Sequence, residues 1–306
     1  MTMLDHARIV AFLLLVLTSI GVLPIPQGTR TLELADDGAW CWFQDPRAVY
    51  VAGAHARTYA CWVTSRGALL IGAFDHATGA IERYTLKDSW GADDHNTGSL
   101  LVLPDHRLMV FYARHNEPGL YCRRTVRPED ITAWDDEVTV TSMPRVTYSH
   151  PAFLDAEQRY FVFWRGESWK PTFATSKDGI SWSAPRILVQ EPGREGADIR
   201  PYLKVVSDGK RTIHLAFTDG HPRDEAYNAI HYLRYEAGRF TRADGTLVGR
   251  EQEVPLAASR CDLVYDARVA GVRAWVWDCA VDSTGWPAIA YTRLPSETDH
   301  RYHVAR

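Results

Sequence analysis

The chain has 306 residues, of which 46% are hydrophobic and 24% are charged, and its formal net charge is -4. This composition excludes a disordered chain, a collagen and a coiled coil, and it supplies enough apolar residues for a sizeable core. Because no block of basic residues stands out, we do not expect the protein to bind nucleic acid. Aromatic residues make up 11% of the chain, and they suit either core packing or platforms for sugar rings.

Near the N-terminus an apolar run, IVAFLLLVLTSIGVL, extends from Ile9 to Leu23 and is followed by Pro24 and Pro26. The run is short for a membrane span and suits the hydrophobic region of a secretory signal. Because no A-x-A cleavage site follows it, we expect residues 1–29 to be a signal peptide or an N-terminal membrane anchor. Residues 30–306 then form the folded domain, and the protein is predicted to be secreted or periplasmic.

Export would permit disulfide bonds, but the number of cysteines is odd, their spacing is wide and no C-x-x-C occurs. We therefore expect buried, unpaired thiols rather than a disulfide framework. A metal site of one cysteine with histidines is the alternative. The residues concerned are Cys41, Cys61, Cys122, Cys261 and Cys279.

From about residue 31 the chain reads as short apolar or alternating segments rich in Val, Tyr, Phe and Trp, such as TYACWVTS, LMVFYAR and YFVFWRG. Turn signals such as SRG, HATG and SDGK separate these segments, and none shows sustained helical periodicity. The pattern predicts an all-β chain, either a β-propeller of four-stranded blades or a sandwich.

One short motif favours the propeller. The segment Ser176–Trp182 has the form S-x-D-G-x-x-W, the Asp-box of sialidase-like propellers. Asp178 can accept backbone N–H groups in a tight turn, Gly179 permits a positive φ, and Trp182 can pack beneath the turn. At roughly 40 to 45 residues per blade, residues 30–306 predict six to seven blades.

Two polar segments flank one predicted hairpin. Asp93–Gly98 precedes the strand SLLVLP, and Ala113–Pro118 follows the strand LMVFYAR. Antiparallel pairing would bring His95 and His115 to the same rim, where two imidazoles suit a general base, a metal site or a charge stabiliser. Two ordinary surface loops are the alternative interpretation.

A second hairpin repeats this design, with Tyr148 before one strand and Arg165 at the end of the next. An arginine can bind a carboxylate in bidentate fashion, and a tyrosine can donate a proton to a leaving oxygen. Taken alone, Arg165 suits a structural role equally well. Together the four residues are the groups required for β-elimination on a uronic acid. One group neutralises the carboxylate, one removes the C5 proton and one protonates the glycosidic oxygen.

Several segments resemble the BNR-repeat family that contains the ulvan lyases. They are GAWCWFQDPRAVYV, DDHNTGSLLVLPDHRLMVFYARHN, TYSHPAFL, RPYLKV, FTDGHP and DHRY. The resemblance implies a seven-bladed propeller that cleaves rhamnose–glucuronate linkages by β-elimination. Because the family's chains usually continue beyond the DHRY segment, we expect the blades here to be fewer than seven.

By this resemblance, His95 and His115 fall on the family's catalytic histidine pair, Tyr148 on its catalytic tyrosine and Arg165 on its carboxylate-neutralising arginine. Tyr202 falls on a further tyrosine that contacts the substrate. We also expect substrate contacts from three neighbours of these residues, Asn96, Asn116 and Trp164.

The implied partner is an acidic polysaccharide or oligosaccharide, and the chemistry requires no cofactor. Asp219 and His221, which follow the strand IHLAFTD, could bind a structural calcium or zinc ion or could order their own loop. Two other functions stay open: a sialidase-like glycoside hydrolase and a non-catalytic carbohydrate-binding propeller. No P-loop, G-x-G-x-x-G, H-E-x-x-H or G-x-S-x-G motif supports nucleotide, zinc-protease or serine-hydrolase chemistry.

Overall fold

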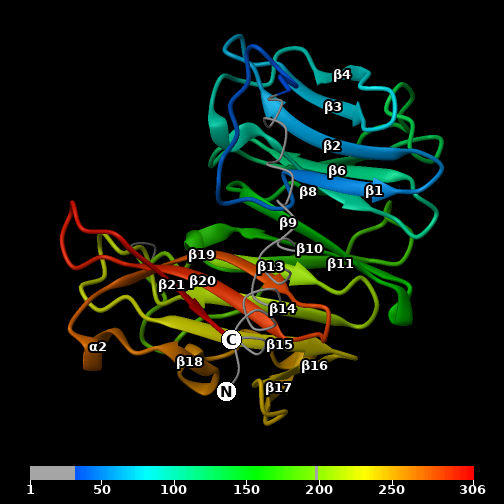
Figure 1. Ribbon diagram of the computed structural model, residues 1–306. Helices are drawn as coiled ribbons and strands as arrows, with labels where there is room; N and C mark the ends of the chain where they lie inside the picture. Colours follow the sequence, from blue (N-terminus) through cyan, green and yellow to red (C-terminus); the bar gives the residue numbers. More distant parts are fainter. Residues whose placement is uncertain (1–31, 197–198) are drawn as a thin grey trace, which may run out of the picture. The chain divides into compact units, whose positions relative to one another are not determined.

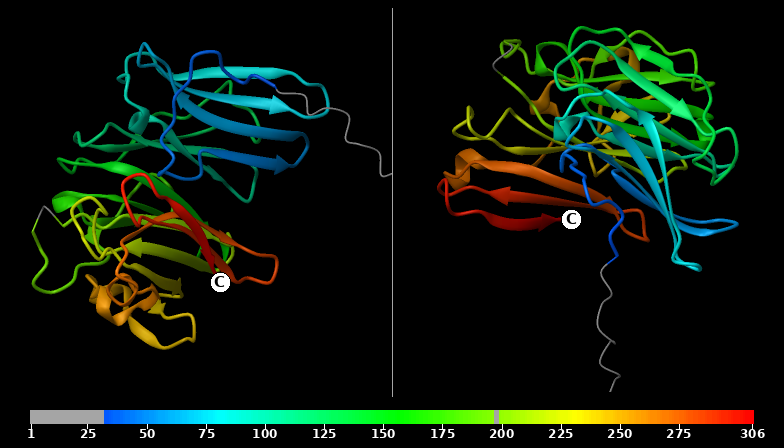
Figure 2. Two further views of the ribbon diagram at one scale, coloured as in Figure 1. Left: turned by 60° about the vertical axis from the view of Figure 1, so that its left-hand side comes forward. Right: turned by 90° about the horizontal axis from the view of Figure 1, so that it is seen from above.

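Short antiparallel strands dominate the computed structural model, which describes residues 32–196 and 199–306. Within these residues the strands form five sheets that follow one another along the chain (Figures 1 and 2). The predicted signal or anchor segment, residues 1–29, lies outside the described residues. In the part of the chain that is described, no helix is long and apolar enough to cross a membrane.

The first three sheets have four strands each. The first contains β1 (Ala48–Ala52), β2 (Ala56–Val63), β3 (Leu69–Asp75) and β4 (Ile81–Lys87). The second contains β5 (Gly98–Val102), β6 (Leu108–Ala113), β7 (Leu120–Arg124) and β8 (Val138–Thr141). The third contains β9 (Thr147–Leu154), β10 (Arg159–Arg165), β11 (Pro171–Ser176) and β12 (Arg186–Ile187).

The last two sheets depart from this size. The fourth contains β13 (Leu203–Ser207), β14 (Thr212–Thr218), β15 (Ile230–Glu236), β16 (Arg239–Thr241) and β17 (Leu247–Arg250), with β18 (Asp262–Tyr265) paired to β15. The fifth contains β19 (Ala274–Val281), β20 (Pro287–Arg293) and β21 (Arg301–Ala305). Helical structure is limited to single turns: η1 (Asp94–Asn96), η2 (Asp155–Glu157), η3 (Glu167–Trp169), η4 (Glu251–Glu253), η5 (Ala258–Arg260) and α2 (Ala267–Ala270).

The first strands of successive sheets lie side by side: β1 next to β5, β5 next to β9, β9 next to β13 and β13 next to β19. This arrangement is a β-propeller, as the sequence pattern predicted. The structure has five blades in the described residues, which confirms the expectation of fewer than seven and corrects the length-based estimate of six to seven. Segments such as 188–196 and 251–261 carry no strand, and the fourth sheet has six strands, so the chain uses more residues per blade than the estimate assumed.

Apolar side chains fill the space between neighbouring sheets, and each interface has its own buried cluster. The Asp-box turn has the predicted geometry. Asp178 Oδ1 accepts the backbone N–H groups of Ile180 at 2.8 Å and Ser181 at 2.7 Å, and Gly179 has a φ of 75°. Trp182 packs against Phe111 of the second sheet with 5.7 Å between ring centroids. All five cysteines are buried and unpaired, as predicted.

Replacing Leu215 tests how much one interface contributes to stability. Leu215 is fully buried between the third and fourth sheets, whereas Leu247 is 40% exposed. Leu215→Ala removes buried methyl groups and leaves a cavity, so we expect the free energy of unfolding to fall by about 2–5 kcal/mol. Leu247→Ala should change it by no more than about 0.5 kcal/mol. Urea denaturation measures both, and equal losses would contradict this assignment of the core.

Candidate functional site

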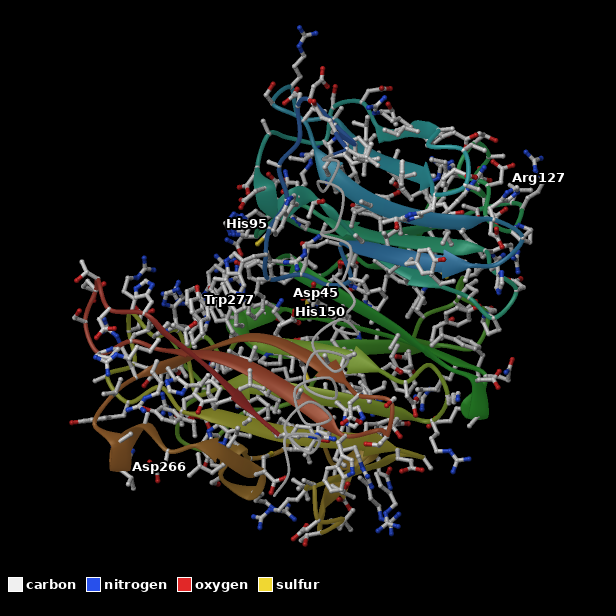
Figure 3. All side chains as sticks on the ribbon, in the orientation of Figure 1. Asp45, His95, Arg127, His150, Asp266 and Trp277 are labelled. Atoms are coloured by element: carbon white, nitrogen blue, oxygen red, sulfur yellow. The ribbon has the colours of Figure 1, made fainter. Side chains whose placement is uncertain are left out.

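Four predicted site residues lie at one rim of the propeller, where the first strand of a sheet begins and the second ends. His95 lies in η1 just before β5, and His115 follows β6. Tyr148 lies at the start of β9, and Arg165 ends β10, where it pairs with Thr147. Since both strand pairs are antiparallel, the two hairpins present these side chains at the same rim; Figure 3 labels His95 there.

The two histidines form a stacked pair. Their ring centroids are 3.8 Å apart and their planes differ by 7°. Asp93 joins them, because its Oδ1 lies 2.6 Å from His95 Nδ1 and its Oδ2 lies 3.0 Å from His115 Nδ1. An ionised carboxylate only accepts hydrogen bonds, so each Nδ1 carries the hydrogen. In a neutral ring this leaves Nε2 as the atom that can take a proton.

Burial favours the neutral form of the His115 imidazole. Burial opposes ionisation of Asp93, but hydrogen bonds from the His95 amide and from both imidazoles outweigh it and lower the pKa of Asp93 to about 2. Burial lowers the pKa of His115 below its usual value of 6.5, aided by the nearby charges of His95 and Arg165. His115 is therefore able to accept a proton near neutral pH.

Asn96, which is predicted to contact substrate, connects the two loops that carry the histidines. Its side chain is buried, and its Oδ1 accepts the backbone N–H of His115 at 2.8 Å. Its Nδ2 donates to the Gly91 carbonyl at 3.1 Å, and its own carbonyl accepts from Trp90 Nε1 at 3.1 Å. Asn96 thus fixes the distance between the loops that carry His95 and His115.

Arg165 is held between two aromatic rings. Its guanidinium carbon lies 4.7 Å from the Tyr148 ring centroid and 4.7 Å from that of Trp169. Its Nη1 donates to Tyr202 Oη and its Nη2 to Asn116 Oδ1, each at 3.0 Å. Asn116 and Tyr202, both predicted as substrate contacts, therefore also orient this guanidinium. The remaining N–H groups of the planar fork are available for a carboxylate.

Tyr148 has an unusual backbone conformation. Its φ is 61°, and the register between β9 and β10 shifts at this point. A positive φ in an aromatic residue is strained and is kept only where the surroundings impose it. The ring centroid lies 5.3 Å from that of His95. Burial and the neighbouring Tyr202 raise the pKa of Tyr148, so its phenol remains protonated and can donate a proton.

Residues 42–47 support this site from the centre of the propeller. The Phe43 ring packs edge-to-face against Tyr148 at 4.9 Å and against Tyr202 at 4.8 Å. Beneath it lies Lys204, which is 1% exposed and whose Nζ is 4.8 Å from the Phe43 ring centroid. Lys204 forms an ion pair with Asp45, which Figure 3 labels near His150.

His150 lies fully buried beside Phe43, and neither of its ring nitrogens has a hydrogen-bond partner. Burial lowers its pKa well below the usual value, aided by the charges of Lys204 and Arg47. His150 is therefore neutral, and it lines a small cavity together with Tyr148 and Arg165.

Trp164 lines the same small cavity as Tyr148, Arg165 and Tyr202, from the core side. Successive side chains of a strand point to opposite faces, so Trp164 faces away from Arg165. It is 1% exposed and packs in the core between the second and third sheets. Substrate contact by Trp164 stays a prediction.

Asp219 and His221, the predicted metal ligands, lie after β14 and are engaged locally. Asp219 accepts from His231 Nε2 at 2.8 Å and from the Ala229 amide at 3.0 Å. His221 Nδ1 accepts the Arg223 amide at 3.0 Å. These contacts fit the loop-ordering alternative, and metal binding at this pair stays a prediction.

A different set has the composition of a metal site. Among the described residues, Asp93, His95 and His115 form the one group of three whose ligand atoms lie within 4.8 Å of one another. Two imidazoles and a carboxylate suit zinc. The N–O distances of 2.6 and 3.0 Å are those of hydrogen bonds, so the same atoms also form the network described above.

Sequence reasoning missed three residues of the site: Asp93, Trp169 and Phe43. The run Asp93–Asp94 beside His95 was a usable signal for Asp93, since a carboxylate next to a histidine commonly orients it. Nothing in the pattern around Trp169 or Phe43 distinguishes these two from the other aromatic residues of the chain.

Comparison with known proteins identifies the family. Residues 57–306 match the model of the BNR repeat-containing family. The chain belongs to this family. A search of curated proteins found no significant match.

Solved structures similar to this BNR-repeat protein include several enzymes. The polysaccharide lyase Uly1 has a TM-score of 0.51 at 12% identity, over 90% of this chain and 71% of that one. The α-L-arabinanase of Penicillium chrysogenum has a TM-score of 0.49 at 10% identity, over 88% and 82% of the two chains. The sialidase of Trypanosoma rangeli has a TM-score of 0.48 at 10% identity, over 84% and 44%. The likeness to Uly1 supports the propeller fold.

Replacing Asp93 tests the network around the histidines. The hydrogen bond and charge of Asp93 raise the pKa of His115, against the larger effect of burial. In Asp93→Asn that support is lost, so we expect the pKa of His115 to fall further below 6.5. Proton NMR titration of the histidine ring signals measures it. The matched control is Asp219→Asn, which removes a carboxylate beside His231 and should leave the pKa of His115 unchanged. A rise of the His115 pKa in Asp93→Asn would contradict the network.

Proposed function

We propose that this protein is a polysaccharide lyase that cleaves a uronate-containing glycan by β-elimination. The observation that carries the proposal is the position of the Arg165 guanidinium. It lies between Tyr148 and Trp169, beside a stacked histidine pair, and its hydrogen-bond partners are Tyr202 and Asn116. A buried cation whose hydrogen-bond partners are neutral suits an anionic ligand.

Arg165 would bind the uronate carboxylate. Pairing the carboxylate with the guanidinium reduces its negative charge and makes the adjacent C5 proton more acidic. The two flanking rings fix the plane of the guanidinium, so little reorganisation is needed when charge develops on the carboxylate during proton removal. This electrostatic stabilisation is the main contribution expected from Arg165.

The histidine pair and Tyr148 would move the protons. His115, neutral and with Nε2 unprotonated, removes the C5 proton, and Asp93 stabilises the imidazolium that forms. The electrons of the C5–H bond form the C4=C5 double bond as the C4–O bond breaks. Tyr148, held in its protonated form by burial, donates its proton to the departing glycosidic oxygen.

The family resemblance supports an ulvan-like rhamnose–glucuronate linkage as the substrate, and the likeness to the polysaccharide lyase Uly1 is consistent with it. The same proposal includes secretion or periplasmic location through residues 1–29, because an acidic polymer is encountered outside the cell. The chemistry described needs no cofactor. A metal ion at Asp93, His95 and His115 would occupy the proposed base, so it would inhibit rather than assist this mechanism.

Incubation with a panel of glucuronate-rich polymers tests the reaction class. β-Elimination creates an unsaturated uronate that absorbs in the ultraviolet, and we expect this absorbance to rise with at least one polymer. New reducing ends without absorbance would indicate a hydrolase of the sialidase type. Binding without either signal would indicate a non-catalytic carbohydrate-binding propeller. Either of these outcomes would overturn the proposal.

Two substitutions test the mechanism. In Arg165→Lys an ammonium keeps the charge but not the planar fork, and Tyr148→Phe keeps the ring but loses the hydroxyl. Because one acid–base group is typically worth about 10²–10⁴-fold in rate, we expect losses of this order in kcat for both variants. Initial rates of unsaturated product formation measure them.

Matched controls for these substitutions are Arg127→Lys and Tyr50→Phe, at exposed positions; Figure 3 labels Arg127 far from His95. Both controls should retain the wild-type rate. Near-normal rates from Arg165→Lys and Tyr148→Phe would show that the chemistry lies elsewhere.

A further inference from the structure

The loop after β10 has a strained backbone conformation. Ser168 has a φ of 51° and Trp169 a φ of 61°, so two consecutive residues with side chains adopt the left-handed region. Such a conformation costs free energy and persists only where the surrounding structure imposes it, commonly at functional sites. The Gly166 amide donates to the Lys170 carbonyl at 2.9 Å, and the Trp169 amide donates to the Gly166 carbonyl at 3.1 Å. These bonds close the loop and fix the position of Trp169.

The Trp169 indole has two cationic neighbours. The guanidinium carbon of Arg165 lies 4.7 Å from its ring centroid, and that of Arg145 lies 5.6 Å from it. Arg165 is buried and Arg145 is exposed, whereas Trp169 is half-buried. Each guanidinium is attracted to the indole, but the two positive charges repel each other, and an anion bound between or beside them would relieve that repulsion.

Arg145 differs from most arginines of this protein in its partners. Arginines such as Arg124 and Arg159 pair with carboxylates. In the described part of the chain, the one contact recorded for the Arg145 guanidinium is the Trp169 ring. Its charge is therefore available to a ligand, and it lies on the same indole as the arginine assigned to the uronate.

We propose that Trp169 and Arg145 form a second anion-binding subsite, which holds the sugar adjoining the bound uronate by an acidic substituent. That the ligand is a glycan rests on the proposed function. Trp169 holds the Arg145 guanidinium near Arg165, and Arg145 pairs with a carboxylate or a sulfate ester on the adjoining sugar. Because both guanidiniums contact the same indole, the site favours a glycan with acidic groups on neighbouring residues.

Steady-state kinetics on a cleavable acidic polymer tests the subsite. An exposed charge pair with good geometry contributes modestly, so we expect Arg145→Ala to raise KM by roughly 2–5-fold. The loss should appear in KM rather than in kcat, and it should shrink at high salt. Arg127→Ala removes the same charge at a distant exposed position and should leave KM unchanged. Equal KM values for Arg145→Ala and Arg127→Ala would overturn the subsite.

A binding experiment separates this proposal from the proposed function. Calorimetry with acidic oligosaccharides in the Tyr148→Phe background measures affinity without turnover. If the wild type forms no unsaturated product yet Arg145→Ala still weakens binding, the subsite stands and the lyase proposal falls. If product forms and Arg145→Ala binds as tightly as its parent, the subsite falls alone. Chemical desulfation of the oligosaccharide distinguishes the sources: an effect that disappears indicates a sulfate ester, and one that persists indicates a carboxylate.

Discussion

Burial of the Arg165 guanidinium is the constraint around which the rim is organised. A cation that is only 8% exposed loses most of its hydration, and its hydrogen-bond partners here are a phenol and an amide. Two aromatic faces and two neutral oxygens recover part of that free energy. The acceptors come from the second and fourth sheets and the rings from the third, so the guanidinium depends on three blades packing correctly. An anionic ligand would supply the charge that the protein does not.

The conformations of neighbouring residues follow from this requirement. Tyr148 reaches the guanidinium because the bulge in β9 and its positive φ turn the ring inward, and Phe43 then fills the space behind it. Lys204 lies under Phe43 as a second buried cation, but it has the carboxylate of Asp45 as a partner. The two buried cations therefore differ in role, because Lys204 has a carboxylate partner and Arg165 does not. The Lys204 charge is satisfied within the protein and supports the ring, whereas the Arg165 charge is left for a ligand.

The sequence predicted the fold class and the meeting of the two hairpins, because strand alternation and hairpin spacing are local properties. It predicted fewer than seven blades but not the number five, because a count from chain length does not allow for strandless segments such as 251–261. For Trp164 the sequence predicts substrate contact, and strand alternation buries its ring in the core, where it also lines the small cavity beside Arg165. The sequence did not predict the position of Trp169, because that position depends on positive φ values at Ser168 and Trp169. Neither residue type indicates a positive φ.

A formal net charge of -4 and an acidic polymer as ligand are compatible, because association depends on the local field rather than on the total charge. Most arginines of the protein are neutralised by nearby carboxylates, as at Arg159 with Glu251, and contribute little to that field. At the rim the carboxylate of Asp93 is hydrogen-bonded to both histidines, so its charge is directed at the imidazoles rather than at the ligand. Arg165 and Arg145 are left with neutral contacts. In the proposed complex, these two charges would pair with the anionic groups of the glycan whose C5 proton His115 removes.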